Sequence, residues 1–362
     1  MKNYHRQLRF APVAVVAAIV LTSCGPQSTP VNEDRASSLS GSLVGAGSSA
    51  QGSAQAAWIS AFEAANPDVA VNYEATGSGA GRESFIAGDV DFGGSDSFLK
   101  AEEIENGFAG CVAESGYIEV PVYISPIAVI FNVEGVSQLN MDSATIAAIF
   151  KGTVTSWRDP AIVVQNPEAD LPEEAIAVIH RADDSGTTKN FADYLSKTAA
   201  AVWDAPVSDT FPYLAGKGAD QTKGVVAAVV NGENTIGYAD ASQAGDLGVV
   251  SLKVGDQYVP YTAEAAAAVV AGSPFVESRP NSDLAINLNR STIDPEHYPL
   301  VLVTYIIACA EYESETKGEL VKAYLNYLTS ASGQDAAAFA TGSAPMTPSL
   351  SARVLTVVAS IR

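Results

Sequence analysis

Residues 181–191, RADDSGTTKNF, place Arg181 four positions before a run of Ser185, Gly186 and Thr187. A guanidinium group offers planar N–H donors, and a glycine beside hydroxyl residues lets backbone N–H groups approach a ligand closely. These residue types at this spacing favour the binding of an anion. The feature is unexpected in a chain with 41 acidic and 20 basic residues and a formal net charge of −21.

The order of strand, glycine- and serine-rich loop, and helix occurs three times in the chain. Apolar residues 41–47 precede a helical pattern that stops at Asn66 and Pro67, and an alternating strand at 69–75 precedes GSGAGRESFIAG at 77–88. A helix N-terminus carries about half a positive charge and several unpaired N–H donors, so it can bind an anion in an acidic protein. One such loop is most often only a helix cap. Three loops, one of them preceded by arginine, favour a shared anion site.

Strands that alternate with helices predict α/β layers with largely parallel sheets. The third unit occupies residues 175–197, and residues 317–340 predict one further helix near the C-terminus. The glycine runs match neither a Walker loop nor a dinucleotide-binding fingerprint. The 362 residues, 47% of them hydrophobic, are enough for one large or two medium cores. The strong acidity argues against nucleic acid as a partner, because long-range repulsion would oppose its binding.

The N-terminus predicts export and a lipid anchor. Lys2, Arg6 and Arg9 precede an apolar run that ends in LTSC at Cys24. We interpret residues 1–24 as a lipoprotein signal peptide with Cys24 as the lipidated residue; an ordinary signal peptide with a chance cysteine is the alternative. Residues 25–42 are polar and rich in proline and serine, which predicts a flexible tether. The expected location is the extracytoplasmic face of the cell membrane, held by the lipid.

Two cysteines remain after Cys24. Cys111 and Cys309 form an even pair in a compartment that is expected to be oxidising. A disulfide is therefore the favoured interpretation. Two buried free thiols are the alternative, since sequence alone cannot place their Cα atoms within bridging distance.

Six segments resemble those of the phosphate-binding proteins of the phosphate-specific ABC importer, the PstS family, in the same order and spacing: LVGAGSSAQ, YEATGSGAGRESFIAGDVDFGGSD, FKGTVTSWRDPAI, VIHRADDSGTT, TIGYADAS and APMTPSL. The resemblance implies a type II periplasmic-binding-protein fold, with two α/β lobes joined by two crossover strands and a ligand cleft between them. It places the first lobe at residues 43–124 and 299–362 and the second at 125–298. Residues 120–126 and 298–306 would be the crossover strands.

The resemblance also implies a set of site residues. The expected phosphate-binding residues come from all three loops and from the end of DFGGSD: Ser49, Ala50, Ser78, Asp96, Arg181, Ser185, Gly186 and Thr187. Asp183 is expected to orient Arg181 by an ion pair. Many relatives have threonine-phenylalanine where this chain has Ser49-Ala50, so either Ser48 or Ser49 can be the residue that points inward. Arg82 has no counterpart in the family pattern, and we expect a solvated side chain in the first turn of a helix, with a charge behind the site as the alternative.

The implied function is high-affinity binding of inorganic phosphate and its delivery to the permease subunits of the importer. A monomer without cofactor or enzymatic activity is expected. Sulfate or molybdate is the alternative ligand, although an acceptor at Asp96 suits an anion that still carries a proton. A secreted phosphohydrolase is a further alternative because Ser185 lies near His180 and Asp184, but the chain lacks the G-x-S-x-G turn of such enzymes.

The remaining conspicuous residues are expected to have structural roles. Trp157 and the pair Gly237 and Tyr238 are interpreted as packing and turn residues of the second lobe. His180 and His297 are isolated from any second histidine or cysteine at ligand spacing, so no metal site is expected.

Overall fold

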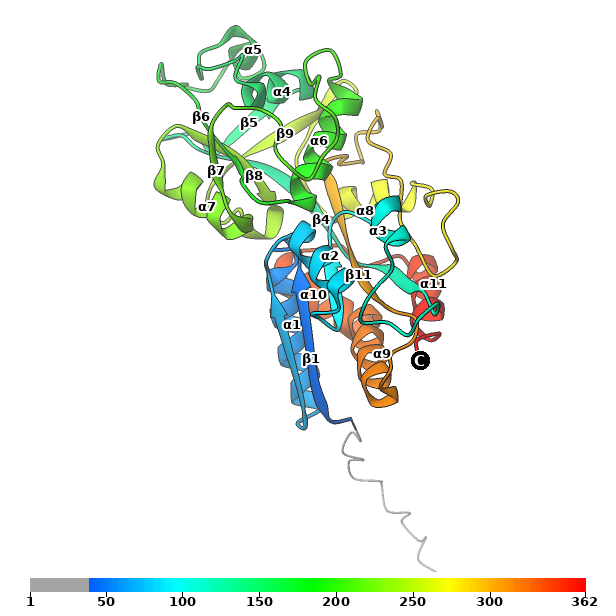
Figure 1. Ribbon diagram of the computed structural model, residues 1–362. Helices are drawn as coiled ribbons and strands as arrows, with labels where there is room; N and C mark the ends of the chain where they lie inside the picture. The colour runs from blue at the N-terminus through cyan, green and yellow to red at the C-terminus, as the bar shows by residue number, and fades with distance from the viewer. Residues whose placement is uncertain (1–38) are drawn as a thin grey trace, which may run out of the picture. The chain divides into compact units, whose positions relative to one another are not determined.

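The computed structural model describes residues 39–362, which form one compact unit (Figure 1). The expected signal segment, the lipidation site Cys24 and nearly all of the expected tether lie outside the described residues. The first strand begins at Gly41, within the stretch that was expected to be tether. No helix in residues 39–362 is both long and apolar enough to cross a membrane.

The N-terminal part of this unit is a parallel sheet whose strands are followed by helices. β1 pairs in parallel with both β2 and β3, so the loops after these strands meet at one edge of the sheet. Each of the first two loops leads into a helix, as the sequence pattern predicted. The elements are β1 (Gly41–Gly47), α1 (Gly52–Ala65), β2 (Val69–Glu74), α2 (Ser78–Ala87), β3 (Phe92–Ser95) and α3 (Ala101–Glu105).

Two long antiparallel strands connect the two halves of the sheet: β4 (Tyr117–Asn132) and β11 (Val301–Cys309). β4 contains the expected crossover segment 120–126, and β11 begins three residues after the start of the expected segment 298–306. The strand order is β2-β1-β3-β11-β4-β8-β6-β7, so β11 and β4 lie between the N-terminal strands and the later ones (Figure 1). Their register shifts between Thr304 and Tyr305, opposite Pro121. A proline cannot donate to the ladder, which accounts for an irregularity at this point.

A second group of strands and helices surrounds the C-terminal half of β4. β8 pairs antiparallel with β4 and parallel with β6, while β9 pairs with β4, β5 and β10. The elements are β5 (Gln138–Met141), α4 (Ser143–Lys151), α5 (Pro160–Val163), β6 (Ala177–Arg181), α6 (Gly186–Thr198), β7 (Lys217–Ala219), α7 (Gln221–Asn231), β8 (Thr235–Asp240), η1 (Ala241–Gln243), β9 (Gly248–Val254), β10 (Gln257–Val259) and α8 (Ala263–Ala271).

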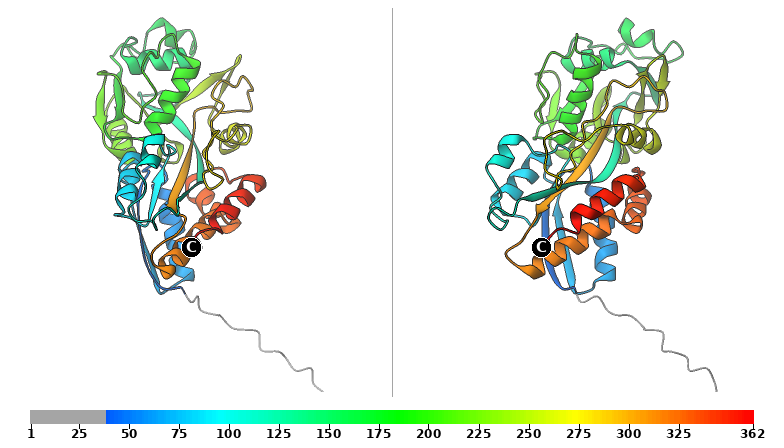
Figure 2. Two further views of the ribbon diagram at one scale, coloured as in Figure 1. Left: turned by 45° about the vertical axis from the view of Figure 1, so that its right-hand side comes forward. Right: turned by 90° about the vertical axis from the view of Figure 1, so that its right-hand side faces the viewer.

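Three helices end the chain: α9 (Glu315–Thr329), α10 (Ala331–Thr341) and α11 (Pro348–Val358). α9 packs on β1 and α1, α10 packs on α1, and α11 packs on α9 and β4. Figure 2 shows them in orange and red beside the blue N-terminal elements. The single helix predicted at 317–340 is wrong in one respect, because Ser330 divides it. Ser330 is extended, and its hydroxyl accepts the Gly333 N–H as the cap of α10.

We call β1–β3 with α1–α3 and α9–α11 the first lobe, and β5–β10 with α4–α7 the second lobe. The expected boundary after residue 124 falls inside β4, and the one before residue 299 falls just ahead of β11. Residues 39–362 are one compact unit by their contacts, so these boundaries stay a prediction.

The expected packing residues lie in the core of the second lobe. Trp157 is buried against the ring of Phe131, and its Nε1 donates to the carbonyl of Asn234 at 3.3 Å. Tyr238 is equally buried, with its ring stacked on Phe191 at a centroid distance of 4.3 Å. Tyr238 also has a polar role at the end of β6, described below.

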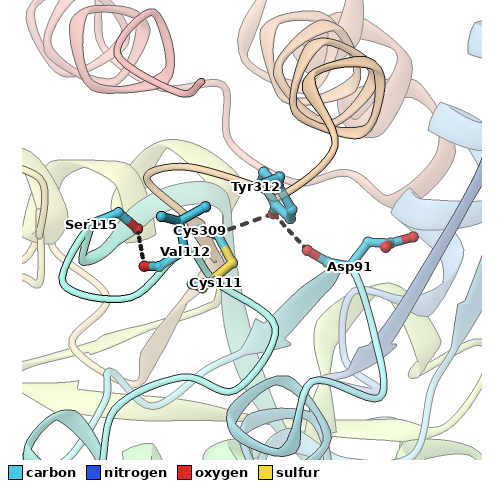
Figure 3. The surroundings of a disulfide bond; sticks show 6 residues. All are labelled: Asp91, Cys111, Val112, Ser115, Cys309 and Tyr312. Carbon is cyan, nitrogen blue, oxygen red and sulfur yellow. Dashed lines mark hydrogen bonds between the residues drawn. A yellow bond between two sulfur atoms is a disulfide. The ribbon is translucent and has the colours of Figure 1, made fainter.

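The structure contains the expected disulfide between Cys111 and Cys309, whose Cα atoms lie 5.2 Å apart (Figure 3). It ties the loop before β4 to the last residue of β11 across 198 positions of sequence. Tyr312 supports the same corner, because its hydroxyl accepts the Cys309 N–H at 3.1 Å and donates to the carbonyl of Asp91 at 2.7 Å. The disulfide therefore holds one end of a crossover strand within the first lobe.

Candidate anion-binding site

The third loop begins where β6 ends at Arg181 and finishes where α6 begins at Gly186. Ser185 is the N-cap of α6, and its hydroxyl accepts the Thr188 N–H at 3.2 Å. The expected ion pair is present: Arg181 Nε donates to Asp183 Oδ1 at 2.7 Å, and Arg181 Nη2 also binds the carboxylate. The first turn of α6 and the arginine therefore lie on the same short segment.

Arg181 is buried, with 3% of its surface exposed, and it is held in one orientation. Burial alone would raise the pKa of Asp183, but the hydrogen bonds and charge of Arg181 lower the pKa overall. Asp183 Oδ1 also accepts the backbone N–H of Gln221, and the hydroxyl of Tyr238 accepts the Arg181 N–H at 3.4 Å. Within residues 39–362, Arg181 Nη1 has no hydrogen-bond acceptor, so the guanidinium group keeps donor capacity for a ligand.

Asp96 follows β3 and is the centre of a hydroxyl network. Oδ1 accepts Ser48 Oγ at 2.6 Å and Thr304 Oγ1 at 2.7 Å, while Oδ2 accepts Thr187 Oγ1 at 3.3 Å. These donors come from the first loop, from crossover strand β11 and from the first turn of α6. Asp96 thus joins both lobes and the strand between them.

Burial and hydrogen-bond donors have opposite effects on the pKa of Asp96. Burial raises the pKa of its carboxyl group, and the hydroxyls of Ser48 and Thr304 together with the charge of Arg181 offset part of that rise. A carboxylate has about four acceptor positions, of which the three hydroxyls occupy three. One acceptor position is therefore left for a proton that a ligand carries.

The two serines of the first loop have different partners. Ser48 is fully buried and its hydroxyl contacts Asp96, as described above, and it also accepts the Ala50 N–H at 3.2 Å. The Ser49 hydroxyl lies 3.0 Å from Thr222 Oγ1 and accepts the Thr222 N–H at 3.0 Å. Ser48 is thus the serine on the Asp96 side, and Ser49 is a bridge to the start of α7 in the second lobe.

The second loop meets the third loop without intervening side chains. The Ser78 hydroxyl accepts the Asp96 N–H at 3.1 Å, and a Cβ atom on Gly186 would lie 2.7 Å from Ser78 Oγ and from Asp96 Cβ. A Cβ atom on Gly77, whose φ is +107°, would lie 2.5 Å from Asp183 Oδ2. Glycine is needed at both positions because the two lobes approach each other here.

The eight expected site residues lie on the three loops and at the end of β3, and these segments meet at the junction of the lobes: Ser49, Ala50, Ser78, Asp96, Arg181, Ser185, Gly186 and Thr187. Their contact with an anion stays a prediction, and the Ser49 hydroxyl is bound to Thr222. Their groups are helix N–H donors, hydroxyls, one guanidinium group and one carboxylate. Such a set can bind a small oxyanion and accept one hydrogen bond from a hydroxyl group that the anion carries. No group of histidine, cysteine and acidic side chains suited to a metal ion occurs within residues 39–362.

The expectation for Arg82 is wrong. Only 2% of its surface is exposed, and it forms ion pairs with Glu103 and Asp209, with Nε and Nη2 each 3.0 Å from a carboxylate oxygen. Glu103 belongs to the first lobe and Asp209 to the loop before β7 in the second lobe. A charged residue in the first turn of a helix is usually solvated, but here two carboxylates compensate for its burial.

Sequence reasoning missed three other residues at the junction: Thr304, Thr222 and Asp209. Thr304 had a weak signal, since it is a single hydroxyl residue in the apolar strand VLVTYI. Thr222 follows the start of a helix, where a hydroxyl residue usually indicates only a cap. Asp209 had no signal, because an aspartate in a polar loop is ordinary.

The alternative catalytic arrangement is not assembled. The ring of His180 stacks on Phe211 at 4.1 Å, and its Nδ1 lies 2.8 Å from the carbonyl of Arg181. The Ser185 hydroxyl contacts the N–H of Thr188, and within the described residues it has no contact with His180. A serine nucleophile needs a hydrogen-bonded base, and this geometry does not provide one.

Comparisons with known proteins identify the family. A family model described as the PBP superfamily domain matches residues 32–332. The chain is 36% identical over 289 residues to phosphate-binding protein PstS 3 of Mycobacterium leprae, covering 78% of this chain and 77% of that protein. It is 28% identical over 300 residues to phosphate-binding protein PstS of Haemophilus influenzae, covering 82% of this chain and 86% of that protein.

Solved structures support the fold. A high affinity periplasmic phosphate-binding protein (PfluDING), bound with phosphate, gives a TM-score of 0.71 at 21% identity, covering 87% of this chain and 93% of that chain. A phosphate ABC transporter substrate-binding protein from Clostridium perfringens gives a TM-score of 0.58 at 21% identity, covering 83% and 98%. The fold is the expected type II periplasmic-binding-protein fold, with two α/β lobes joined by two crossover strands. With relatives this similar over most of its length, the chain belongs to the PstS family of phosphate-binding proteins within the PBP superfamily.

Proposed function

We propose that the chain binds inorganic phosphate between its two lobes and delivers it to an ABC importer. The observation that carries this proposal is the convergence of Arg181, the N-terminus of α6 and Asp96 at the junction of the lobes. Donors alone would suit any oxyanion. A carboxylate among them suits an anion that still carries a proton.

The preference for phosphate over sulfate follows from the proton that phosphate carries. Phosphate near neutral pH carries at least one P–OH group, which can donate to the acceptor position that Asp96 keeps. Sulfate has no proton to give, so it would leave a buried acceptor unpaired and facing a like charge. Sites that bind a particular ligand hydrogen can reject analogues without it by roughly 10⁴- to 10⁵-fold. Phosphate is therefore the ligand that this donor and acceptor set fits best.

The assignment of contacts follows from the same geometry. We assign ligand contacts to the eight residues named above, with Asp183 as the residue that orients Arg181. Ser48 then positions the Asp96 carboxylate. We further propose that residues 43–124 and 299–362 act as one lobe and residues 125–298 as the other, because closure brings their donors to one anion.

The proposed setting is the outer face of the cell membrane. Cys24 would carry the lipid, residues 25–40 would be the tether that joins the lipid to the binding domain, and the permease subunits would be the partners. The protein would act as a monomer and would not turn over its ligand. Replacement of Cys24 by serine should release the protein from membranes, and retention of the variant in the membrane fraction would argue against the anchor.

Calorimetry of residues 39–362 with phosphate, sulfate and molybdate tests the proposed ligand. We expect tight binding of phosphate at one site and no measurable heat with the other two anions. Binding of sulfate or molybdate with equal or greater affinity would refute the assignment. Incubation with p-nitrophenyl phosphate tests the absence of hydrolysis in the same preparation.

A further inference from the structure

Asp209 is a second-lobe carboxylate that three first-lobe groups contact. Ser97 Oγ donates to Asp209 Oδ1 at 2.6 Å, and Arg82 Nη2 donates to Oδ2 at 3.0 Å. Lys100 Nζ lies 3.4 Å from the same Oδ2. Asp209 is buried, with 4% of its surface exposed. These contacts form a second connection between the lobes, separate from the expected anion contacts.

Arg82 also has hydrogen-bond partners within its own lobe. Its Nε donates to both oxygens of Glu103 at 3.0 and 3.2 Å, and its Nη1 donates to Ser95 Oγ at 3.0 Å. Glu103 is in turn held by the backbone N–H of Lys100 at 2.7 Å. The guanidinium group is therefore already oriented, so little side-chain entropy is lost when Asp209 arrives.

Asp209 is also joined to the third loop. Its carbonyl accepts the Ser185 N–H at 2.9 Å, and Ser185 caps the helix whose first turn is part of the candidate site. One residue thus contacts Arg82 through its side chain and the third loop through its backbone. A movement of the second lobe away from the first would break the side-chain contacts and leave the backbone contact intact.

We propose that Arg82 and Asp209 are positioning residues that set the affinity for phosphate by stabilising the closed arrangement of the lobes, without touching the anion. This inference rests on the proposed function. In the closed arrangement the Arg82–Asp209 pair is shielded from water, and in an open one both groups are hydrated. The pair therefore contributes to the free-energy difference between the two arrangements, and hence to the apparent dissociation constant.

The charges around the pair favour this role. Burial by itself would raise the pKa of Asp209, but the charge of Arg82 and the hydroxyl of Ser97 lower the pKa overall. The carboxylate therefore stays ionised when it meets Arg82. Removal of one partner leaves the other as a buried charge with fewer compensating groups, and such losses reduce affinity far more than the loss of an exposed pair.

A double-mutant cycle with Arg82→Met and Asp209→Asn tests the proposal. Calorimetry on residues 39–362 should show phosphate binding weakened about 10- to 100-fold in each single variant. The loss of affinity in the double variant should be smaller than the sum of the two single losses, expressed as free energies, because the shared contact is lost only once. Arg158→Met, which removes an exposed ion pair with Glu173, is the matched control and should bind like the parent.

Two readouts separate positioning from direct contact. The preference for phosphate over sulfate should stay as in the parent, because neither side chain touches the anion. Small-angle scattering without phosphate should show a more open average shape in the variants than in the parent. A changed anion preference would instead place one of these residues in the binding site and would overturn the proposal.

A third variant keeps the test decisive if a charge variant fails to fold. Ser97→Ala removes only one hydrogen bond to Asp209 and should weaken phosphate binding about 3- to 10-fold. Urea unfolding of each variant shows whether it is folded. If the parent binds phosphate and the folded variants bind equally well, this inference is wrong. If the parent itself binds no phosphate, the proposed function is wrong.

Discussion

Replacement of Asp96 by asparagine removes the charge from the carboxylate and keeps its shape. Oδ1 accepts the two short hydrogen bonds, from Ser48 and Thr304, so the amide oxygen should take this position and keep both. The amide N–H₂ would then replace Oδ2, where Thr187 Oγ1 lies 3.3 Å away. A donor would thus stand where the parent offers an acceptor to the ligand.

The effects on the two anions have opposite signs. Phosphate loses one charge-assisted hydrogen bond, of about 1.5 to 3 kcal/mol, so its affinity should fall about 10- to 150-fold. That figure is a net value for a hydrogen bond between charged groups, whereas sulfate has no proton to donate to Asp96 and its repulsion by the carboxylate is not offset. For sulfate the change therefore removes a repulsion. Two unit charges about 4 Å apart at an effective dielectric constant of about 20 repel by about 4 kcal/mol, so sulfate affinity should rise about 10³-fold.

Calorimetric titration of phosphate and sulfate into the parent and Asp96→Asn measures both effects. Asp89→Asn is the control, since it makes the same chemical change at an exposed position. We expect sulfate binding to become measurable in Asp96→Asn alone. If the variant still rejects sulfate as strongly as the parent, discrimination resides elsewhere in the junction and the reasoning about Asp96 is refuted.

Four further predictions follow from the same geometry. Arg181→Lys should weaken phosphate binding about 100-fold in a titration, because an ammonium group cannot both pair with the carboxylate beside it and present a planar donor; unchanged affinity would contradict this. Gly186→Ala should weaken phosphate binding about 10- to 100-fold, because its Cβ atom would lie 2.7 Å from atoms of Ser78 and Asp96 in the first lobe. Gly224→Ala is the control and should bind phosphate normally, because its Cβ atom would lie no closer than 3.7 Å to its neighbours. Replacement of both bridged cysteines by alanine should lower the free energy of unfolding by about 5 kcal/mol, because the disulfide closes a loop of 198 positions and so reduces the entropy of the unfolded chain. Urea titrations measure this loss, and a loss below about 1 kcal/mol would contradict the entropic explanation. Burial raises the pKa of Asp240 from 3.8 to about 6, so the folded protein keeps a proton that the unfolded chain releases. This contribution to stability falls by about 2 kcal/mol as pH rises from 4 to 7, and Asp240→Asn should flatten that part of the profile of unfolding free energy against pH.

The local parts of the site could be predicted from the sequence because each is contained in a short segment. Arg181, Asp183 and the cap at Ser185 lie within five residues, so spacing alone places them at one helix N-terminus. The order of strands and helices predicted the α/β fold for the same reason. Proximity of the loops after β1 and β2 followed from parallel strands, whose carboxyl ends share one edge of a sheet. The third loop follows β6, which antiparallel strands separate from β3, so its place at the site depends on how the lobes meet.

The contacts between distant segments could not be predicted in this way. Thr304 meets Asp96 across 208 positions, and Asp209 meets Arg82 across 127 positions. No local pattern fixes such pairs, because they depend on how the two lobes meet. Arg82 was misinterpreted for this reason: one of the two carboxylates that compensate for its burial, Asp209, comes from the other lobe.

The break at Ser330 shows a similar limit. The apolar spacing continues through residues 317–340, so periodicity predicts one helix. A Cβ atom on Gly333 would lie 2.0 Å from the carbonyl of Tyr327, which shows how closely the chain turns back on itself there. α10 packs against α1, and this contact fixes the position of the turn. The local sequence does not show this contact.

A crystal structure of residues 39–362 grown with phosphate tests the central claim most directly. We predict one phosphate at the junction of the lobes, with Arg181 and the N–H groups of α6 donating from the second lobe, and Ser78 donating and Asp96 accepting from the first. A phosphate bound by residues of one lobe alone, or at a place without Arg181 and Asp96, would contradict the account.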